Sequence, residues 1–211
     1  MIFLKNNPFF HFVETTHSTN SLLNEMVENN EGKPFPDFFG VVTDFQTAGK
    51  GQGSKTWQSR RGENVLVSFY FQPSITPAQQ IYFNYFFALT IRKAISIYVN
   101  NVTIKKPNDI LADGQKIAGI LIEHHIQGVK LKYSVAGVGI NVNQTQFDPV
   151  LPNPVSLQLI TGKEFDRGNI LEEIVQIGQK YYNKLQNGAL MELENEYESY
   201  VRNVQKEEKP D

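Results

Sequence analysis

Residues suited to binding an anion are concentrated in one stretch, 46–57 (QTAGKGQGSKTW), with three glycines, two lysines and the only tryptophan of the chain. Glycines let backbone N–H groups approach an anion closely, and lysines add positive charge. Trp57 could cover a flat ring. The stretch therefore suits a ligand that carries phosphate at one end and an aromatic base at the other. The plain alternative is a flexible surface hairpin.

A second cluster, 105–116 (KKPNDILADGQK), combines lysines with a rigid polar corner. Its proline restricts the backbone, so Asn108 and Asp109 are held at a fixed turn. A carboxylate and an amide oxygen there could hold Mg²⁺, which prefers oxygen ligands. Lys105 and Lys116 flank the corner on neighbouring strands, where two ammonium groups and a metal would neutralise a triphosphate. The plain alternative is a turn with solvated lysines.

Two further motifs each have a structural and a functional interpretation. Ser18, Thr19 and Asn20 stand at a helix start, where they would either cap the helix or face a small polar head group. Residues 137–141 (GVGIN) place two glycines inside a strand. Such glycines mark either a bulge or the close approach of a ligand, to which Asn141 would add a polar contact.

Several kinds of site are excluded by the residues that the chain lacks. It has no GxxxxGK[ST] phosphate loop and no GxGxxG dinucleotide fingerprint. It has no cysteine, which removes thiolate metal sites and a cysteine nucleophile and fits a reducing compartment. The four histidines show no metal-ligand spacing, and His124 and His125 would point to opposite faces of a strand.

Bulk properties, with 40% hydrophobic and 20% charged residues, point to a globular, soluble protein. The formal net charge of −2 does not favour nucleic acid, and no apolar run reaches membrane-spanning length. The N-terminal segment lacks the features of a signal peptide. We therefore expect a cytoplasmic protein without nucleic-acid or membrane partners.

Strands dominate the first two thirds of the chain, and helices gather towards its end. This order predicts an α+β fold with a mixed, mainly antiparallel sheet and helices packed on one side. The Asp113–Gly114 pair predicts a two-residue hairpin turn. The expected strands are 9–14, 38–45, 64–71, 102–105, 109–112, 116–126 and 129–143, and the expected helices are 19–29, 78–99, 170–185 and 191–201.

The motifs, in this order, resemble those of the catalytic domain of biotin protein ligases. They are Ser18-Thr19-Asn20, 46–52 with Trp57, 105–109 (KKPND), 116–121 (KIAGIL) and 137–141 (GVGIN). The resemblance runs from about residue 10 to 145. It implies the fold of biotin ligases and class II aminoacyl-tRNA synthetases. It also implies ATP-dependent formation of biotinyl-5′-AMP and transfer of biotin to a lysine of a carboxylase's biotin carrier domain.

The resemblance also assigns roles to single residues. Those implied to bind biotin are Ser18, Thr19, Asn20, Gln46, Gly49, Lys116 and Gly137. Those implied to bind ATP or the adenylate are Lys50, Gly51, Gln52, Trp57, Asn108 and Asn141. Lys116 and Lys105 are implied to be catalytic, and Asp109 to contact Mg²⁺.

The chain departs from the family pattern at three positions. Lys50 and Gln52 stand where arginines are usual, and Lys106 stands where tryptophan is usual. We expect residues 1–190 to form the catalytic domain and 191–211 a helix with a charged tail. No DNA-binding segment and no small C-terminal β domain are expected. Exposed strand edges would permit a homodimer.

Two alternatives to the ligase stay open. A lipoyl or octanoyl transferase would have a similar catalytic domain. A non-catalytic biotin-binding module would fit the short C-terminus and the changes at Gln52 and Lys106.

Overall fold

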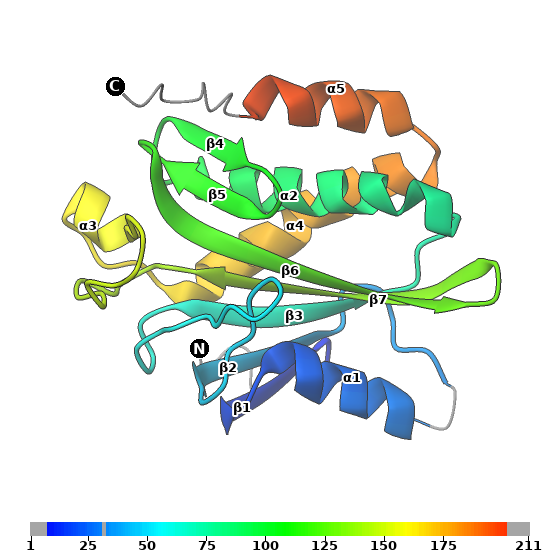
Figure 1. Ribbon diagram of the computed structural model, residues 1–211, viewed down its shortest axis with the longest axis horizontal. Coiled ribbons are helices and arrows are strands. Elements are labelled where there is room, and N and C mark those ends of the chain that lie inside the picture. Colours follow the sequence, from blue (N-terminus) through cyan, green and yellow to red (C-terminus); the bar gives the residue numbers. More distant parts are fainter. Residues whose placement is uncertain (1–7, 31–32, 202–211) are drawn as a thin grey trace, which may run out of the picture.

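The computed structural model describes residues 8–30 and 33–201, which form a seven-stranded sheet with helices on both faces (Figure 1). The sheet order is β1-β2-β3-β7-β6-β5-β4. Only β1 and β2 pair in parallel, and all other neighbours are antiparallel. This confirms the mixed, mainly antiparallel sheet. The strands are β1 (Phe10–Thr16), β2 (Gly40–Gln46), β3 (Val65–Phe71), β4 (Val102–Lys105), β5 (Asp109–Ala112), β6 (Gln115–Gln127) and β7 (Lys130–Ile140).

The helices cover both faces of the sheet, so the expectation that they pack on one side is wrong. The helices are α1 (Thr19–Asn29), α2 (Gln80–Ile95), α3 (Leu157–Thr161), α4 (Arg167–Gln186) and α5 (Leu190–Tyr200). Figure 1 shows α1 on one side of the sheet, and α2, α4 and α5 on the other. The physical reason lies in the central strands. Successive strand residues point to opposite faces, and every residue of β3 is buried, so both faces need a cover.

Two cores follow from this arrangement. Val42 belongs to the larger core under α2 and α4, whereas its neighbour Val41 belongs to a smaller core under α1. In the larger core, the ring of Phe71 packs edge-on against Phe83 and Phe86, with centroids 5.3 and 5.5 Å away. Edge-to-face aromatic pairs of this kind add to the free energy of burial.

The C-terminal helix α5 is part of the same packed body. Its Leu193 and Tyr197 are buried in the larger core. The ring of Tyr197 stacks on Tyr85 of α2 at 4.2 Å between centroids. Residues beyond 201 lie outside the described part of the chain, so the charged tail stays a prediction.

Tight turns set the register that the site depends on. Asp113 and Gly114 both have positive φ angles, 47° and 79°, which makes the two-residue turn that their sequence predicts. The β6–β7 hairpin then places Gly119 opposite Gly139 and Leu121 opposite Gly137. Two glycines therefore lie side by side on neighbouring strands of the sheet.

Within the described residues, no helix is long and apolar enough to cross a membrane.

Candidate active site

One cavity of about 1230 Å³ brings the sequence motifs together. Its wall combines the start of α1, the glycine loop, the 105–109 corner, strands β6 and β7 and a loop that ends at Pro154. Of the residues proposed from the sequence, all but Gly49 line it. They are Ser18, Thr19, Asn20, Gln46, Lys50, Gly51, Gln52, Trp57, Lys105, Asn108, Asp109, Lys116, Gly137 and Asn141.

The charge on the cavity wall favours anions. Among the described residues, the wall contains five lysines and one carboxylate, that of Asp109. The lysines are Lys50, Lys55, Lys105, Lys106 and Lys116. A concave surface lined by one sign of charge concentrates ligands of the opposite sign. The pocket is therefore suited to phosphates and carboxylates.

Trp57 packs on the sheet floor because two glycines leave it room. A methyl carbon at Gly139 would lie 2.3 Å from Cε2 of the indole, and one at Gly119 would lie 2.8 Å from Cζ3. The indole nitrogen is buried without a hydrogen-bond partner. The sequence left open whether the glycines of the 137–141 motif mark a bulge or the close approach of a ligand. At Gly139 the neighbour is instead the tryptophan of the glycine loop.

The glycine loop is a closed hairpin. The Trp57 N–H donates to the Gly49 carbonyl at 2.8 Å, and the Gly51 N–H donates to the Lys55 carbonyl at 2.8 Å. Gly53 takes a φ of 65°, which favours glycine. Gly49 lies outside the wall of the main cavity, and a side chain on it would meet the Trp57 carbonyl oxygen at 2.5 Å. The absence of a side chain at Gly49 thus allows its backbone to lie close to the backbone of Trp57.

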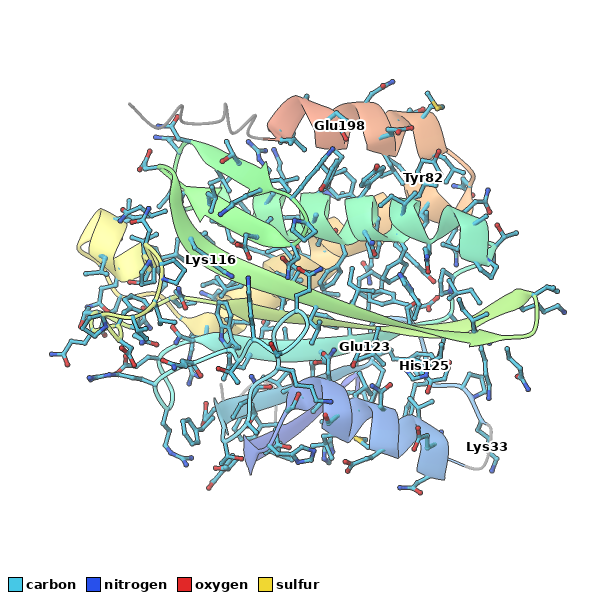
Figure 2. The ribbon with its side chains drawn as sticks, viewed as in Figure 1. Lys33, Tyr82, Lys116, Glu123, His125 and Glu198 are labelled. Atoms are coloured by element: carbon cyan, nitrogen blue, oxygen red, sulfur yellow. The ribbon has the colours of Figure 1, made fainter. Side chains whose placement is uncertain are left out.

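Lys116 and Asp109 form an ion pair on neighbouring strands, with Nζ 2.6 Å from Oδ1 (Lys116 is labelled in Figure 2). The backbone of Lys116 is fixed by two hydrogen bonds to the following loop: its N–H donates to Asn153 and its carbonyl accepts from Val155, each at 2.9 Å. Its ammonium lies 5.7 Å from the Trp57 ring centroid. The proposed catalytic lysine and the proposed metal ligand are therefore direct partners.

The side chains of Asn108 and Asn141 form hydrogen bonds to backbone carbonyl groups in and beside the cavity wall. Asn108 Nδ2 donates to the Ile120 carbonyl at 2.8 Å, and Asn141 Nδ2 donates to the Val155 carbonyl at 3.0 Å. Lys106, beside the corner, points its ammonium at Glu198 of α5, 2.7 Å away. The corner is thus tied both to β6 and to the C-terminal helix.

The start of α1 is capped by Gln46 from β2. Gln46 Oε1 accepts from the Thr19 backbone N–H at 2.8 Å and lies 3.2 Å from the Thr19 hydroxyl. Ser18 occupies the N-cap position, but its side chain makes no capping hydrogen bond. The prediction that Ser18 stands at the N-cap is confirmed, but Gln46 rather than the serine hydroxyl accepts from the free N–H of Thr19. The buried Ser68 of β3 lies 2.7 Å from the Thr19 hydroxyl.

Asn20 is buried and engaged by the protein itself. Its Nδ2 donates to Glu123 Oε2 at 2.8 Å and to the Leu121 carbonyl at 3.3 Å. Its Oδ1 accepts from Ser68 at 2.5 Å. A methyl carbon at Gly137 would lie 2.1 Å from that Oδ1. Gly137 therefore makes room for Asn20.

Ser68 and Glu123 were not among the residues proposed from the sequence. The two-residue period of β6 could have indicated Glu123. Every second residue of a strand lies on the same face, so Gly119, Leu121 and Glu123 share one face of the sheet. The first two of these line the cavity, and Glu123 contacts α1 beside it. No comparable motif surrounds Ser68.

The fold and the cavity define a domain that can hold a small polar head group and anionic groups in one pocket. Residues 12–141 match the biotin/lipoate A/B protein ligase family, so the chain belongs to that family.

Similar proteins agree with this assignment. The bifunctional ligase/repressor BirA of Bacillus spizizenii is 29% identical over 199 residues, which cover 92% of this chain and 59% of that protein. The biotin protein ligase of Aquifex aeolicus, solved with biotin and ATP, superposes with a TM-score of 0.74 at 22% identity, covering 91% of this chain and 78% of that one. The Leishmania major ligase, solved with biotinyl-5-AMP, gives a TM-score of 0.74 at 22% identity, covering 97% and 85%. The chain thus spans about three fifths of the B. spizizenii relative.

Proposed function

We propose that this chain is a biotin–protein ligase. It would join biotin to ATP to give biotinyl-5′-AMP, and then transfer biotin to a lysine of the carrier domain of a biotin-dependent carboxylase. The observation that carries the proposal is that one cavity is lined both by the polar corner at Thr19 and Gln46 and by lysines of the glycine loop, the 105–109 corner and β6. Membership of the family and the ligands of the A. aeolicus and L. major proteins support it.

The first step needs two anions to meet. A carboxylate oxygen of biotin would attack the α-phosphorus of ATP, forming an O–P bond while the bond to the pyrophosphate oxygen breaks. Lys116 and Lys50 would lower the repulsion between the carboxylate and the phosphate and hold them aligned. For this, the Lys116 ammonium would exchange its contact with Asp109 for contacts with the ligands.

The second step needs no nucleophile from the enzyme. The neutral amine of the carrier lysine would attack the acyl carbon, form the amide and lose a proton. The bond from that carbon to the oxygen that bridges it to phosphorus would break, and AMP would leave with this oxygen. Positioning and charge stabilisation are sufficient for such a transfer. We assign the adenine to Trp57 and the phosphates to the glycine loop, because both line the cavity.

The proposed Mg²⁺ would arrive on ATP. Among the described residues, no three histidine or acidic side chains are grouped as a metal site. Asp109 is a single carboxylate, which fits an ion whose other ligands are phosphate oxygens and water. When bound, the ion would neutralise the triphosphate. The side-chain oxygens of Asp109 and Asn108 would hold the ion, and Lys105 would add positive charge toward the phosphates.

The test is to incubate the protein with biotin, Mg-ATP and a carrier domain, and to measure pyrophosphate release and the mass of the carrier. We expect both pyrophosphate and a biotinylated carrier. Biotin binding without pyrophosphate release would instead support a binding module. Thermal stabilisation by lipoate alone would support a lipoyl or octanoyl transferase.

A further inference from the structure

A second and smaller cavity, of about 460 Å³, lies between the glycine loop and strand β6. It adjoins the main cavity, because the two share part of their walls. The shared residues are Lys50, Gly51, Ser54, Lys55, Thr56 and Leu121. The residues that line only the second cavity are Ala48, Gly49, Gly53 and Glu123. The ligands of the proposed function occupy the main cavity, which leaves the second cavity open to another group.

Strand β6 runs from one cavity to the other. Every second residue of a strand lies on the same face, and such residues are about 7 Å apart. Gly119 lines only the main cavity, Leu121 lines both cavities, and Glu123 lines only the second. One face of β6 therefore forms a path of about 13 Å from Glu123 to the floor of the main cavity.

Glu123 gives the second cavity a negative charge of its own. Figure 2 shows this residue on the side of the sheet that faces α1. Its Oε2 accepts from Nδ2 of Asn20 at 2.8 Å and from Nδ2 of Asn24 at 3.1 Å. In residues 8–30 and 33–201, no lysine or arginine forms a salt bridge with the carboxylate, and Oε1, which has no hydrogen-bond partner there, is not buried. A carboxylate without a cationic partner attracts a cation.

The rest of the wall suits a slender chain behind that cation. Ala48, Gly49 and Gly53 have small side chains or none. Leu121 offers an apolar surface at the junction of the cavities, on which methylene groups can pack while a charged head group keeps polar contacts. A group that touches both Leu121 and Glu123 must be long and thin and must end in a cation. A lysine side chain has this form, with a four-carbon stem and an ammonium group.

We propose that the second cavity is the entrance for the carrier lysine, and that Glu123 is the positioning residue that draws the lysine ammonium into it. The inference rests on the proposed function, which needs a lysine of another protein to reach the acyl carbon. The nucleotide fills the main cavity at that stage, so a separate entrance lets the amine approach without displacing the leaving group.

The path ends where the reaction takes place. The proposed function puts the biotin carboxylate beside Lys50 and Lys116, and Lys50 lines both cavities. Lys50 and Lys55 favour the neutral form of an amine that arrives beside them, because like charges disfavour an ammonium. The carrier ammonium loses one proton to bulk water through the second cavity. The neutral nitrogen then bonds to the acyl carbon and gives up a second proton, and AMP leaves with the bridging oxygen.

The experiment compares two nucleophiles on the same enzyme-bound intermediate. The full chain is loaded with biotinyl-5′-AMP and mixed with a carrier domain or with hydroxylamine, a small nucleophile that is uncharged at neutral pH. Biotinylated carrier and biotin hydroxamate are measured over time by mass. Glu123→Gln removes the charge and keeps an acceptor for the two asparagines. It should slow transfer to the carrier by about tenfold and the reaction with hydroxylamine by less than about twofold.

The ratio of the two rates separates positioning from structural support. If Glu123 only supports Asn20, the variant shifts the bound adenylate and slows both nucleophiles equally. Glu28→Gln is the matched control, because the charge of Glu28 also acts on His125, as that of Glu123 does, but Glu28 lines neither cavity. This control should leave both rates unchanged.

Ala48→Leu tests the entrance without changing a charge. Ala48 lines only the second cavity, so a larger side chain narrows it and leaves the main cavity intact. We expect transfer to the carrier to slow by about fivefold or more, with biotin-dependent pyrophosphate release at the wild-type rate. Thr47→Leu is the control, because Thr47 is the neighbouring residue and lines neither cavity.

Two results would overturn the inference and leave the proposed function standing. One is an unchanged ratio of the two rates in Glu123→Gln, and the other is wild-type transfer to the carrier in Ala48→Leu. If the wild-type protein forms no biotinyl-5′-AMP from biotin and Mg-ATP, the proposed function falls, and this inference falls with it.

Discussion

The ammonium of Lys116 lies 2.6 Å from the carboxylate of Asp109, across neighbouring strands of the candidate active site. About a third of the lysine side chain and a fifth of the aspartate side chain are exposed, so the pair is open to ligands. An arriving carboxylate or phosphate would compete with Asp109 for the lysine. When an anion takes the lysine, the carboxylate of Asp109 becomes available to the proposed Mg²⁺. The binding of the anion and of the metal ion are therefore expected to be coupled through this pair.

Replacing this lysine should stop the first chemical step. We expect Lys116→Ala to lower biotin-dependent pyrophosphate release by at least about a hundredfold, because one fixed positive charge at the developing negative charge is lost. Its unfolding midpoint in urea should stay near that of the wild type. Lys93→Ala, on the exposed side of α2, is the matched control. Pyrophosphate release at the wild-type rate in Lys116→Ala would contradict the proposed role.

A side chain at Gly139 should displace Trp57. In Gly139→Ala the new methyl carbon would meet the indole at 2.3 Å, so the ring must leave the sheet floor. Trp57 is the only tryptophan, so fluorescence that is excited where tryptophan but not tyrosine absorbs reports on it alone. We expect red-shifted emission and weaker ATP binding. Gly119→Ala, with a closest approach of 2.8 Å, should give a smaller shift of the same sign. Unchanged emission in both variants would mean that the ring packs elsewhere.

Removing the buried leucine of α5 should destabilise the whole domain. Leu193 is fully buried in the larger core, so Leu193→Ala is expected to lower the free energy of unfolding by about 2–4 kcal/mol. Met191→Ala is the control, since that side chain is 64% exposed, and it should change stability by less than about 0.5 kcal/mol. Urea unfolding measures both. Equal small losses in the two variants would show that α5 is not part of the cooperative core.

Acid should destabilise the protein through His124. Burial, with a smaller contribution from His125, lowers the pKa of His124 below its usual 6.5. The ring packs edge-on against Phe83, and its nitrogens lie 2.8 Å from the Ser134 hydroxyl and 3.3 Å from Asn84. The unfolded chain therefore binds a proton at a higher pH than the folded chain does. Stability is full above about pH 6.5 and is lost as the pH falls towards the folded-state pKa.

The measurement is urea unfolding at about pH 7.5 and about pH 5.5, compared between the wild type and His124→Gln. The variant cannot take up this proton, so its loss of stability between the two values should be smaller. His125 also has a pKa lowered by burial and remains in both proteins, so part of the acid effect should persist. If the free energy of unfolding falls equally in the two proteins between these pH values, protonation of His124 does not contribute to the acid destabilisation.

Local sequence was sufficient for most elements of this fold. The predicted bounds of α1, β4 and β5 match those observed, because each is marked by clear periodicity or by adjacent turn residues. The long apolar run 78–99 proved to be a 3₁₀ turn at Pro77–Gln79 followed by α2, which ends at Ile95. The short helix α3 was missed, since five residues carry almost no periodic signal.

The sequence by itself determined which chemical groups the site would contain, because the glycines, lysines and polar corners stand in short contiguous motifs. It did not determine what each group contacts. Asn20 faces Glu123 across more than a hundred residues, and Gly137 and Gly139 accommodate Asn20 and Trp57. Those contacts depend on strand register and on which face each strand residue points to, and only the assembled sheet fixes both.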